Sequence, residues 1–326
     1  MADHAEDDDF DGDIFIYWGG RAPQHVTHVL IDKSVDDIEL EAFYECYNLL
    51  TVDTHDGIRK IGAYAFYYCT SLKQINLKSA VEIDERAFCK CNNLESVEFG
   101  DRLETIGVEA FCRCSLTHHL KLRSIITIER RAFEFCRRLI DIELSERLQT
   151  IEPDAFQFCE FLQRIAVPLK RDLFELTHFL QRYTQFDYCE QLTTVDLIGQ
   201  DHTKAIASLH MENWRTEISA EINRINQVLP NTHADDKTGE IKLWIDSVMD
   251  KMDHYKAEHG RYVSEGITLL ELALWKATLD EKEDNSVEGR TKKAKVDAES
   301  VRKERRVTCG ADIVIKNVLP FLKLEE

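Results

Sequence analysis

The chain has 326 residues, enough for two domains with a sizeable core. Its 41 basic and 60 acidic residues give a net charge of −19, which argues against general binding to nucleic acid or anionic membranes. The sequence shows no secretory signal and no apolar stretch long enough to span a bilayer, so we expect a cytoplasmic location, with the nucleus as the alternative.

The first segments are an acidic tail and two strand-like runs. Residues 1–13 contain seven acids and no lysine or arginine, so we expect a disordered tail. Residues 14–18 and 26–31 are rich in β-branched and aromatic residues, and Gly19-Gly20 and Pro23 separate them. We expect these two strands to cap the exposed end of the repeats that follow.

A short apolar phrase then recurs six times. Its leading isoleucine returns at steps of 23, 22, 23, 22 and 23 residues, and Ala-Phe follows each time with a cysteine three residues after the Phe. The isoleucines are Ile38, Ile61, Ile83, Ile106, Ile128 and Ile151, and the cysteines are Cys46, Cys69, Cys91, Cys114, Cys136 and Cys159. A fixed period with apolar residues in one phase predicts a stacked repeat fold.

Each copy combines a helix-like half with a strand-like half. From the isoleucine to the cysteine, apolar residues fall at i, i+4, i+5 and i+8, which predicts one or two helical turns. The Leu-x-x-Ile-x-Leu stretch that follows, as in residues 72–77, alternates as a strand does. The sequence therefore predicts an α/β repeat solenoid with a parallel β-ladder and short helical turns, the architecture of leucine-rich repeats.

The complete phrase, Ile-Gly/Asp/Glu-x-x-Ala-Phe-x-x-Cys-x-x-Leu-x-x-Ile-x-Leu, resembles the BspA-type leucine-rich repeat over about residues 26–197. The resemblance implies a right-handed solenoid that binds proteins and has no catalytic residues. Repeat four departs from the pattern, since Leu116 comes one residue early while Leu120 stays in step. Residues 169–185 are an insertion with helical character, after which residues 186–197 restore the second half of a repeat.

Most of the ten cysteines share one phase of the repeat, and we interpret them as small buried apolar residues rather than a disulfide framework. Cys89 and Cys112 differ, because each follows its Phe directly and forms a Cys-x-Cys pair. The other copies have Tyr44, Tyr67, Glu134 and Gln157 at this position. A metal needs four converging ligands, so the sequence favours packing over zinc and predicts no metal and no cofactor.

From about residue 203 the pattern changes to long amphipathic helices. Apolar stripes run along residues 211–229 and 241–275 with Pro230-Asn231 between them, which predicts an antiparallel, coiled-coil-like hairpin over 203–283. Gly260 and Gly266 leave open whether the second part is one bent helix or two. The predicted domains are thus a solenoid over 14–200, the hairpin, and a basic linker with an apolar C-terminal segment over 284–326.

The outward strand positions are the candidate protein-binding residues, because parallel stacking lines up equivalent side chains. These positions are Gln74, Asn76, Ser96, Glu98, His119, Lys121, Asp141, Glu143 and Arg164. The face has mixed charge with an acidic bias, and a merely solvated sheet face is the alternative interpretation.

Two functions from different classes stay open. The first is a non-enzymatic scaffold that binds a protein through the strand face and uses the helical region for docking or homodimerisation; no phosphate-binding loop or converging catalytic set is recognisable. The second is a nuclear protein that contacts nucleic acid through residues 290–306. Between residues 286 and 306 eight bases stand against four acids, although a solvated helix explains the same charges.

Overall fold

The computed structural model describes residues 14–116, 118–177, 182–198 and 211–287. They fall into two compact units, the first containing the solenoid with residues 218–249 and the second containing residues 211–217 and 250–287. The predicted acidic tail, the boundary near residue 200 and the basic segment 290–306 lie outside the described residues. None of the described helices combines the length and the apolar character needed to cross a bilayer.

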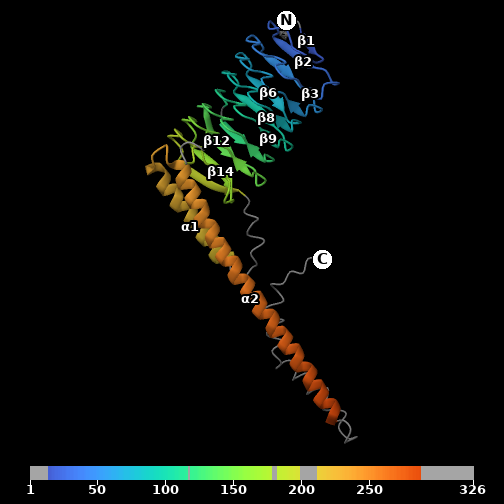
Figure 1. Ribbon diagram of the computed structural model, residues 1–326, viewed down its shortest axis with the longest axis vertical. Coiled ribbons are helices and arrows are strands. Elements are labelled where there is room, and N and C mark those ends of the chain that lie inside the picture. Colours follow the sequence, from blue (N-terminus) through green and yellow to red (C-terminus); the bar gives the residue numbers. More distant parts are fainter. Residues whose placement is uncertain (1–13, 117, 178–181, 199–210, 288–326) are drawn as a thin grey trace, which may run out of the picture. The chain divides into compact units, whose positions relative to one another are not determined.

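The solenoid contains two rows of parallel strands (Figure 1). The row of longer strands comprises β1 (Ile14–Tyr17), β2 (His28–Ile31), β4 (Thr51–Asp53), β6 (Gln74–Leu77), β8 (Ser96–Phe99), β10 (His118–Lys121), β12 (Leu139–Glu143), β14 (Arg164–Pro168) and β15 (Thr194–Ile198). The second row comprises β3 (Asp37–Ile38), β5 (Lys60–Ile61), β7 (Glu82–Ile83), β9 (Thr105–Ile106), β11 (Thr127–Ile128) and β13 (Thr150–Ile151). Each strand of the second row ends in the leading isoleucine of a copy.

This parallel solenoid followed by two helices confirms the predicted fold class. Strand β1 pairs with β2, and β2 pairs with β4, so the predicted strands 14–18 and 26–31 do extend the ladder at the N-terminal end. The second row of strands was not predicted. The shift in repeat four is visible as an irregularity in the pairing of β10 with β12, where Ile140 of β12 is skipped and its side chain is exposed.

Between isoleucine and cysteine the structure has overlapping turns where we expected a helical turn. The reason is a pair of left-handed residues in each copy, one before the alanine and one before the cysteine, which a right-handed helix does not accommodate. In the first copy these are Glu41 and Glu45, with φ of 55° and 59°. Their N–H groups donate to the next copy, at Ala63 O (3.0 Å) and Tyr67 O (2.8 Å), so the turns form a second hydrogen-bonded ladder.

The core consists of two columns that run through all copies. The phenylalanine rings stack with centroids 4.9–5.5 Å apart from Phe43 to Phe186, and all of them are fully buried. From Cys69 onward each column cysteine donates its thiol to the phenylalanine carbonyl of the preceding copy, as Cys136 Sγ does to Phe111 O at 3.1 Å, whereas Cys46 donates to Pro23 O. Burial raises the pKa of the Cys136 thiol above its usual value, so the thiol stays protonated and remains a donor.

The insertion after β14 is not helical in the part that the structure describes, residues 169–177 and 182–185. Phe174 instead forms a parallel bridge with Ile151, and its ring packs edge-on against Phe186 at 5.9 Å. Of the apolar residues that suggested a helix, Leu173 is buried next to Phe174, Leu176 is exposed, and residues 179 and 180 lie outside the described residues.

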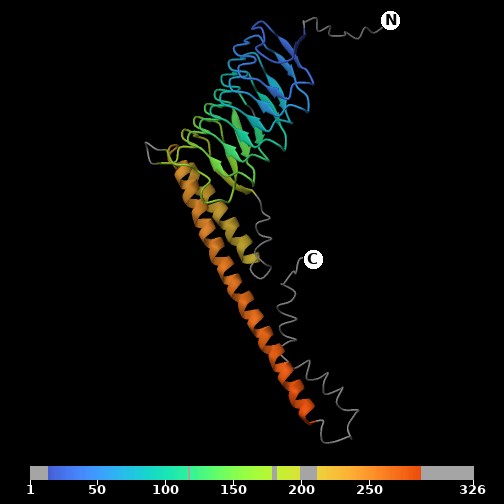
Figure 2. The same cartoon turned by 45° about the vertical axis from the view of Figure 1, so that its right-hand side comes forward.

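The C-terminal part contains α1 (Met211–Val228), a short 3-10 turn η2 (Leu229–Asn231) and α2 (Lys237–Val287). Helix α2 continues through Gly260 and Gly266, so the second apolar stripe forms one helix and not two. In the first unit the Trp244 indole donates to Glu221 O at 3.0 Å. In the second, the Tyr255 hydroxyl hydrogen-bonds to Glu217. Within the first unit, residues 218–228 of α1 and 237–249 of α2 therefore pair antiparallel as predicted (Figure 2).

The helices also close the last turn of the solenoid. The ammonium group of Lys237 is buried and donates to the carbonyl oxygens of Cys189, Glu190 and Leu192 at 2.7–3.0 Å. Thr238 and Asn226 accept the N–H groups of Phe186 and Val195 at 2.9 and 2.8 Å. The N–H and C=O groups of the last repeat, which a further repeat would hydrogen-bond, thus bond to side chains of the helices instead.

We expect Phe111→Ala to lower the free energy of unfolding by about 3–5 kcal/mol, because it leaves a cavity between two stacked rings. Denaturant titration followed by circular dichroism measures the loss. Phe161→Ala is the matched control, since Phe161 is 49% exposed and should change stability by less than about 1 kcal/mol. Equal losses in the two variants would contradict the buried column.

We expect Lys237→Met to destabilise the chain by about 2–3 kcal/mol, because three buried carbonyl groups lose a charged donor. Lys242→Met is the control, since Lys242 pairs only with Asp246 on the same helix face and should cost about 0.5 kcal/mol or less. The comparison uses thermal and denaturant unfolding of both variants. A Lys237→Met protein as stable as the control would show that the carbonyl contacts do not hold the end of the solenoid.

Candidate binding face

The nine predicted binding residues lie on one face, here called the strand face, which consists of the outward positions of β6, β8, β10, β12 and β14. Register places Gln74 beside Ser96, Asn76 beside Glu98, and His119 beside Asp141. The first six of the nine, from Gln74 to Lys121, are exposed, whereas Asp141, Glu143 and Arg164 are half-buried. The structure thus brings together residues that lie 22 or 23 positions apart in sequence, while binding by them stays a prediction.

Asp141 is the centre of an ion-pair network that crosses four strands. One carboxylate oxygen lies 2.8 Å from Nδ1 of His119 on β10, and the other lies 2.9 Å from the guanidinium of Arg164 on β14. Arg164 continues to Asp196 on β15 at 2.6 Å. Only 15% of the Asp141 side chain is exposed, and both carboxylate oxygens are engaged by residues of the same chain.

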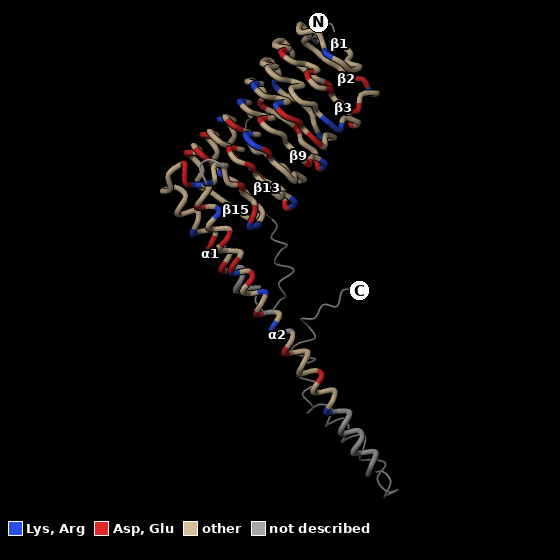
Figure 3. The backbone as a smooth tube through the Cα atoms, in the orientation of Figure 1, with Lys and Arg blue, Asp and Glu red and all other residues tan. Residues whose placement is uncertain are grey.

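The acidic bias expected for this face is offset by pairing. Lys78 Nζ lies 2.7 Å from Glu98, and Lys121 Nζ lies 3.9 Å from Glu143. Together with the Asp141–Arg164 pair, these contacts give each of the three acids a basic neighbour on the same or the adjacent strand. Basic and acidic positions are interspersed along the solenoid (Figure 3). The sequence count missed this because it summed charges without knowing which side chains meet.

A second ordered surface, here called the aromatic ladder, was missed at the sequence level. It consists of the left-handed residues that precede the cysteines from the second copy onward: Tyr68, Lys90, Arg113, Phe135, Phe158 and Tyr188. The rings of Phe135, Phe158 and Tyr188 stack at 4.4 Å, and Arg113 lies 4.4 Å above the Phe135 ring. The sequence contained a signal for this ladder: from Cys69 onward, the residue before each column cysteine is aromatic or basic.

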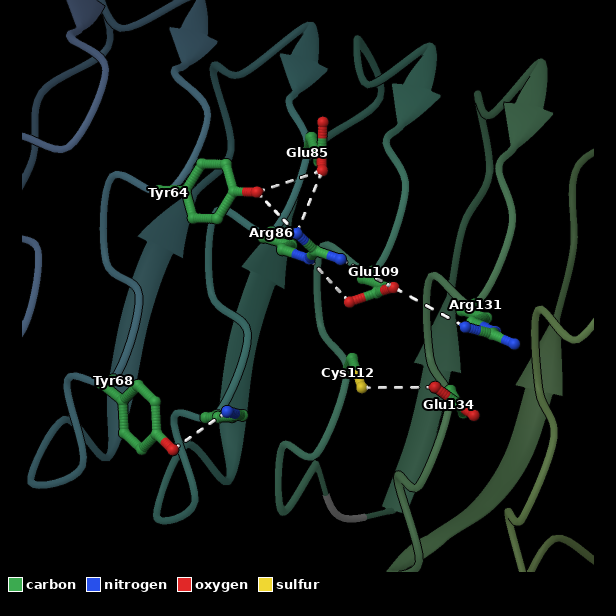
Figure 4. A network of polar contacts seen from close by, with 9 residues as sticks. Tyr64, Tyr68, Glu85, Arg86, Glu109, Cys112, Arg131 and Glu134 are labelled. Carbon is green, nitrogen blue, oxygen red and sulfur yellow. Dashed lines mark hydrogen bonds and ion pairs between the residues drawn. The ribbon is translucent and has the colours of Figure 1, made fainter.

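The left-handed residues that precede the alanines form a polar row beside this ladder (Figure 4). Arg86 holds Glu109 through two hydrogen bonds of 2.7 and 3.2 Å and also donates to the Tyr64 hydroxyl at 2.6 Å. Arg131 lies 4.0 Å from Glu109 on the other side. The Arg86 guanidinium keeps the pKa of Glu109 below its usual range, so Glu109 is an anion at neutral pH.

Among the described residues one group of side chains converges closely enough to hold a metal ion. The ligand atoms of Cys89, Glu109 and Cys112 all lie within 4.8 Å of one another. No sequence motif joined Glu109 to the two cysteines, because the contact depends on how consecutive copies stack.

Comparison with known proteins agrees with this architecture. The model of the BspA type leucine rich repeat region matches residues 23–124 and 119–213 with six copies, which confirms the resemblance noted in the sequence. No curated protein matches the chain.

Three solved structures are similar to the solenoid. A leucine-rich repeat protein from Bacteroides ovatus is 22% identical with a TM-score of 0.44; the match covers 55% of this chain and 48% of that protein, so this chain spans about half its length. The T. pallidum leucine rich repeat protein is 24% identical over 57% of this chain and 74% of its own, with a TM-score of 0.37. A leucine rich cell surface protein from Faecalibacterium prausnitzii is 19% identical over 58% and 81%, with a TM-score of 0.23.

Proposed function

Since the chain belongs to the BspA-type leucine-rich repeat family, we propose that it is a non-enzymatic scaffold whose strand face binds a protein partner. The family is generally one of protein-interaction or surface-binding repeats, and stacked repeats commonly use their extended sheet surface for this purpose. The observation that carries the proposal is the register within the β6–β8 pair and within the β10–β12–β14 sheet, which aligns the outward polar residues of neighbouring copies.

The two ends of the strand face differ in how much of their bonding capacity is in use. At β12 and β14 the network around Asp141 engages its own charged groups. At β6 and β8, Gln74 and Ser96 are exposed neighbours and make no side-chain hydrogen bond to any residue that the structure describes. A partner that contacts Gln74 and Ser96 therefore gains new hydrogen bonds without first breaking an ion pair of these two residues. We place the centre of the contact there.

The partner that fits this end is a polar protein segment with both donors and acceptors. The Gln74 amide and the Ser96 hydroxyl offer both roles, and Glu98 with its neighbour Lys78 offers one charge of each sign. Strands about 4.8 Å apart repeat these groups regularly, which suits an extended or flat surface rather than a single deep side-chain anchor.

We expect Ser96→Arg to weaken binding of the partner at least tenfold while leaving the melting temperature unchanged, because the new side chain occupies the centre of an exposed surface. The partner is first identified by a photo-crosslinking amino acid at position 74, and its affinity is then measured with purified proteins. Gln149→Arg is the control, since Gln149 is exposed but lies outside the strand face. Full affinity in the Ser96→Arg protein, or crosslinks to no partner, would contradict the proposal.

We further propose that the distal part of α2 joins two copies of the chain. Ile267, Leu269, Leu272 and Leu274 have exposed fractions of 45–58%, an unusual concentration of apolar surface for a helix. Ile267, Leu270 and Leu274 follow the three-and-four spacing of a coiled-coil seam. A second copy is the occupant that this spacing favours, because it supplies the same seam in return.

We expect the purified chain to show about twice its monomer mass of 37.9 kDa in light scattering, with dissociation on dilution. The double variant Leu270→Glu/Leu274→Glu should be monomeric, because charges in the seam oppose pairing. Leu243→Glu is the control, since Leu243 is 65% exposed on α2 within the first unit and should leave the mass unchanged. A monomeric wild-type chain at all concentrations would exclude this interface.

A further inference from the structure

Cys89 and Cys112 stand apart from the cysteine column. They occupy equivalent positions in the third and fourth copies, directly after the phenylalanine, and are 3% and 4% exposed. The column thiols donate to phenylalanine carbonyls, whereas the Cys112 thiol is directed to the carboxylate of Glu134 at 3.6 Å. Both residues lie next to the polar row formed by Arg86, Glu109 and Arg131, with Cys112 and Glu134 drawn together in Figure 4.

Three of the ligand atoms around these thiols are close enough to share one metal ion, and Glu134 is the nearest candidate for a fourth. The ligand atoms of Cys89, Glu109 and Cys112 lie within 4.8 Å of one another, and a Glu134 oxygen lies 3.6 Å from the Cys112 sulfur. Zinc bonds of about 2.3 Å to sulfur and about 2.1 Å to oxygen at tetrahedral angles separate the sulfur and oxygen ligands by about 3.6 Å. Cys89, Glu109 and Cys112 are therefore already placed to share one ion, and the Glu134 carboxylate has to turn toward them to become the fourth ligand.

The surrounding charges favour the same interpretation. Two thiolates and two carboxylates carry four negative charges, which a divalent cation and the guanidinium groups of Arg86 and Arg131 would balance. Arg86 already fixes Glu109 through two hydrogen bonds, as residues behind a metal ligand usually do.

We propose that Cys89, Cys112, Glu109 and Glu134 bind one Zn²⁺ ion. Thiolate and carboxylate ligands with tetrahedral spacing suit zinc better than magnesium or calcium, which prefer oxygen ligands in larger numbers. Binding displaces the two thiol protons to solvent and involves no change in oxidation state, so affinity rises with pH. With all four positions filled by protein, the ion holds the third, fourth and fifth copies together and performs no catalysis.

The sequence alone favoured packing over zinc because it showed only the two cysteines. The 23-residue step between Cys89 and Cys112 brings the two sulfurs together, and the same stacking adds Glu109 from the turn before Cys112 and Glu134 from the copy after it. The proposal is independent of the partner on the strand face, since these four residues belong to the turns and not to the long strands.

The test uses the full chain, reduced with a phosphine and freed of metal, and titrates Co²⁺ as a spectroscopic probe. We expect one equivalent to give thiolate charge-transfer bands and the intense visible bands of tetrahedral cobalt, both lost when Zn²⁺ is added. Zn²⁺ alone should raise the melting temperature, and its affinity should fall as pH is lowered. The absence of saturable bands at one equivalent would overturn the proposal.

Variants separate this site from the other thiols. Cys89→Ser and Cys112→Ser should each lower Zn²⁺ affinity at least a hundredfold, and Glu134→Gln about tenfold, whereas Cys46→Ser in the column should retain wild-type binding. Glu134→Gln keeps the test decisive if a cysteine variant fails to fold, as circular dichroism would reveal. Unchanged affinity in all three site variants, or an intact mass showing a Cys89–Cys112 disulfide in place of the metal, would refute the assignment.

Discussion

The buried hydrogen bond from the column thiols, Cys69 onward, to a phenylalanine carbonyl is the constraint on which the solenoid depends. That carbonyl faces the core, where an unpaired acceptor is costly, and a cysteine is small enough to supply a donor beside stacked rings. Because the bond joins neighbouring copies, each copy must repeat the same atoms at the same height. The period of 22 or 23 residues, the two rows of strands and both outer surfaces follow from this requirement.

The same register divides the outer surfaces by role. On the strand face, the end near Asp141 is cross-linked by its own ion pairs, while the end near Gln74 and Ser96 keeps free bonding capacity. On the turns, left-handed residues place aromatic and charged side chains in ladders that stabilise the stack through ring and cation contacts. The residues proposed for binding and those that stabilise the stack are therefore different positions of the same repeat.

The sequence predicted whatever depends on periodicity alone: the stacked copies, the strands that extend the N-terminal end, the outward positions and the antiparallel helices. The prediction from the sequence was wrong where one apolar pattern is compatible with two different local structures. Apolar residues at i, i+4, i+5 and i+8 fit a helical turn, but two left-handed residues such as Glu41 and Glu45 direct the same side chains inward without a helix. It also missed contacts set by stacking geometry, namely the Asp141–Arg164 pair that offsets the acidic bias and the approach of Glu109 to Cys112.

Because the columns connect each copy only to its immediate neighbours, the number of copies in the solenoid can change during evolution without disturbing the rest of the fold. A tandem duplication of one 22- or 23-residue copy inserts a complete turn, restores every thiol-to-carbonyl bond and leaves both ends capped as before. The strand face then gains one strand and two outward positions whose identities the fold does not prescribe. Gene duplication followed by substitution at those positions can thus enlarge the range of recognised partners without selection having to rebuild a core.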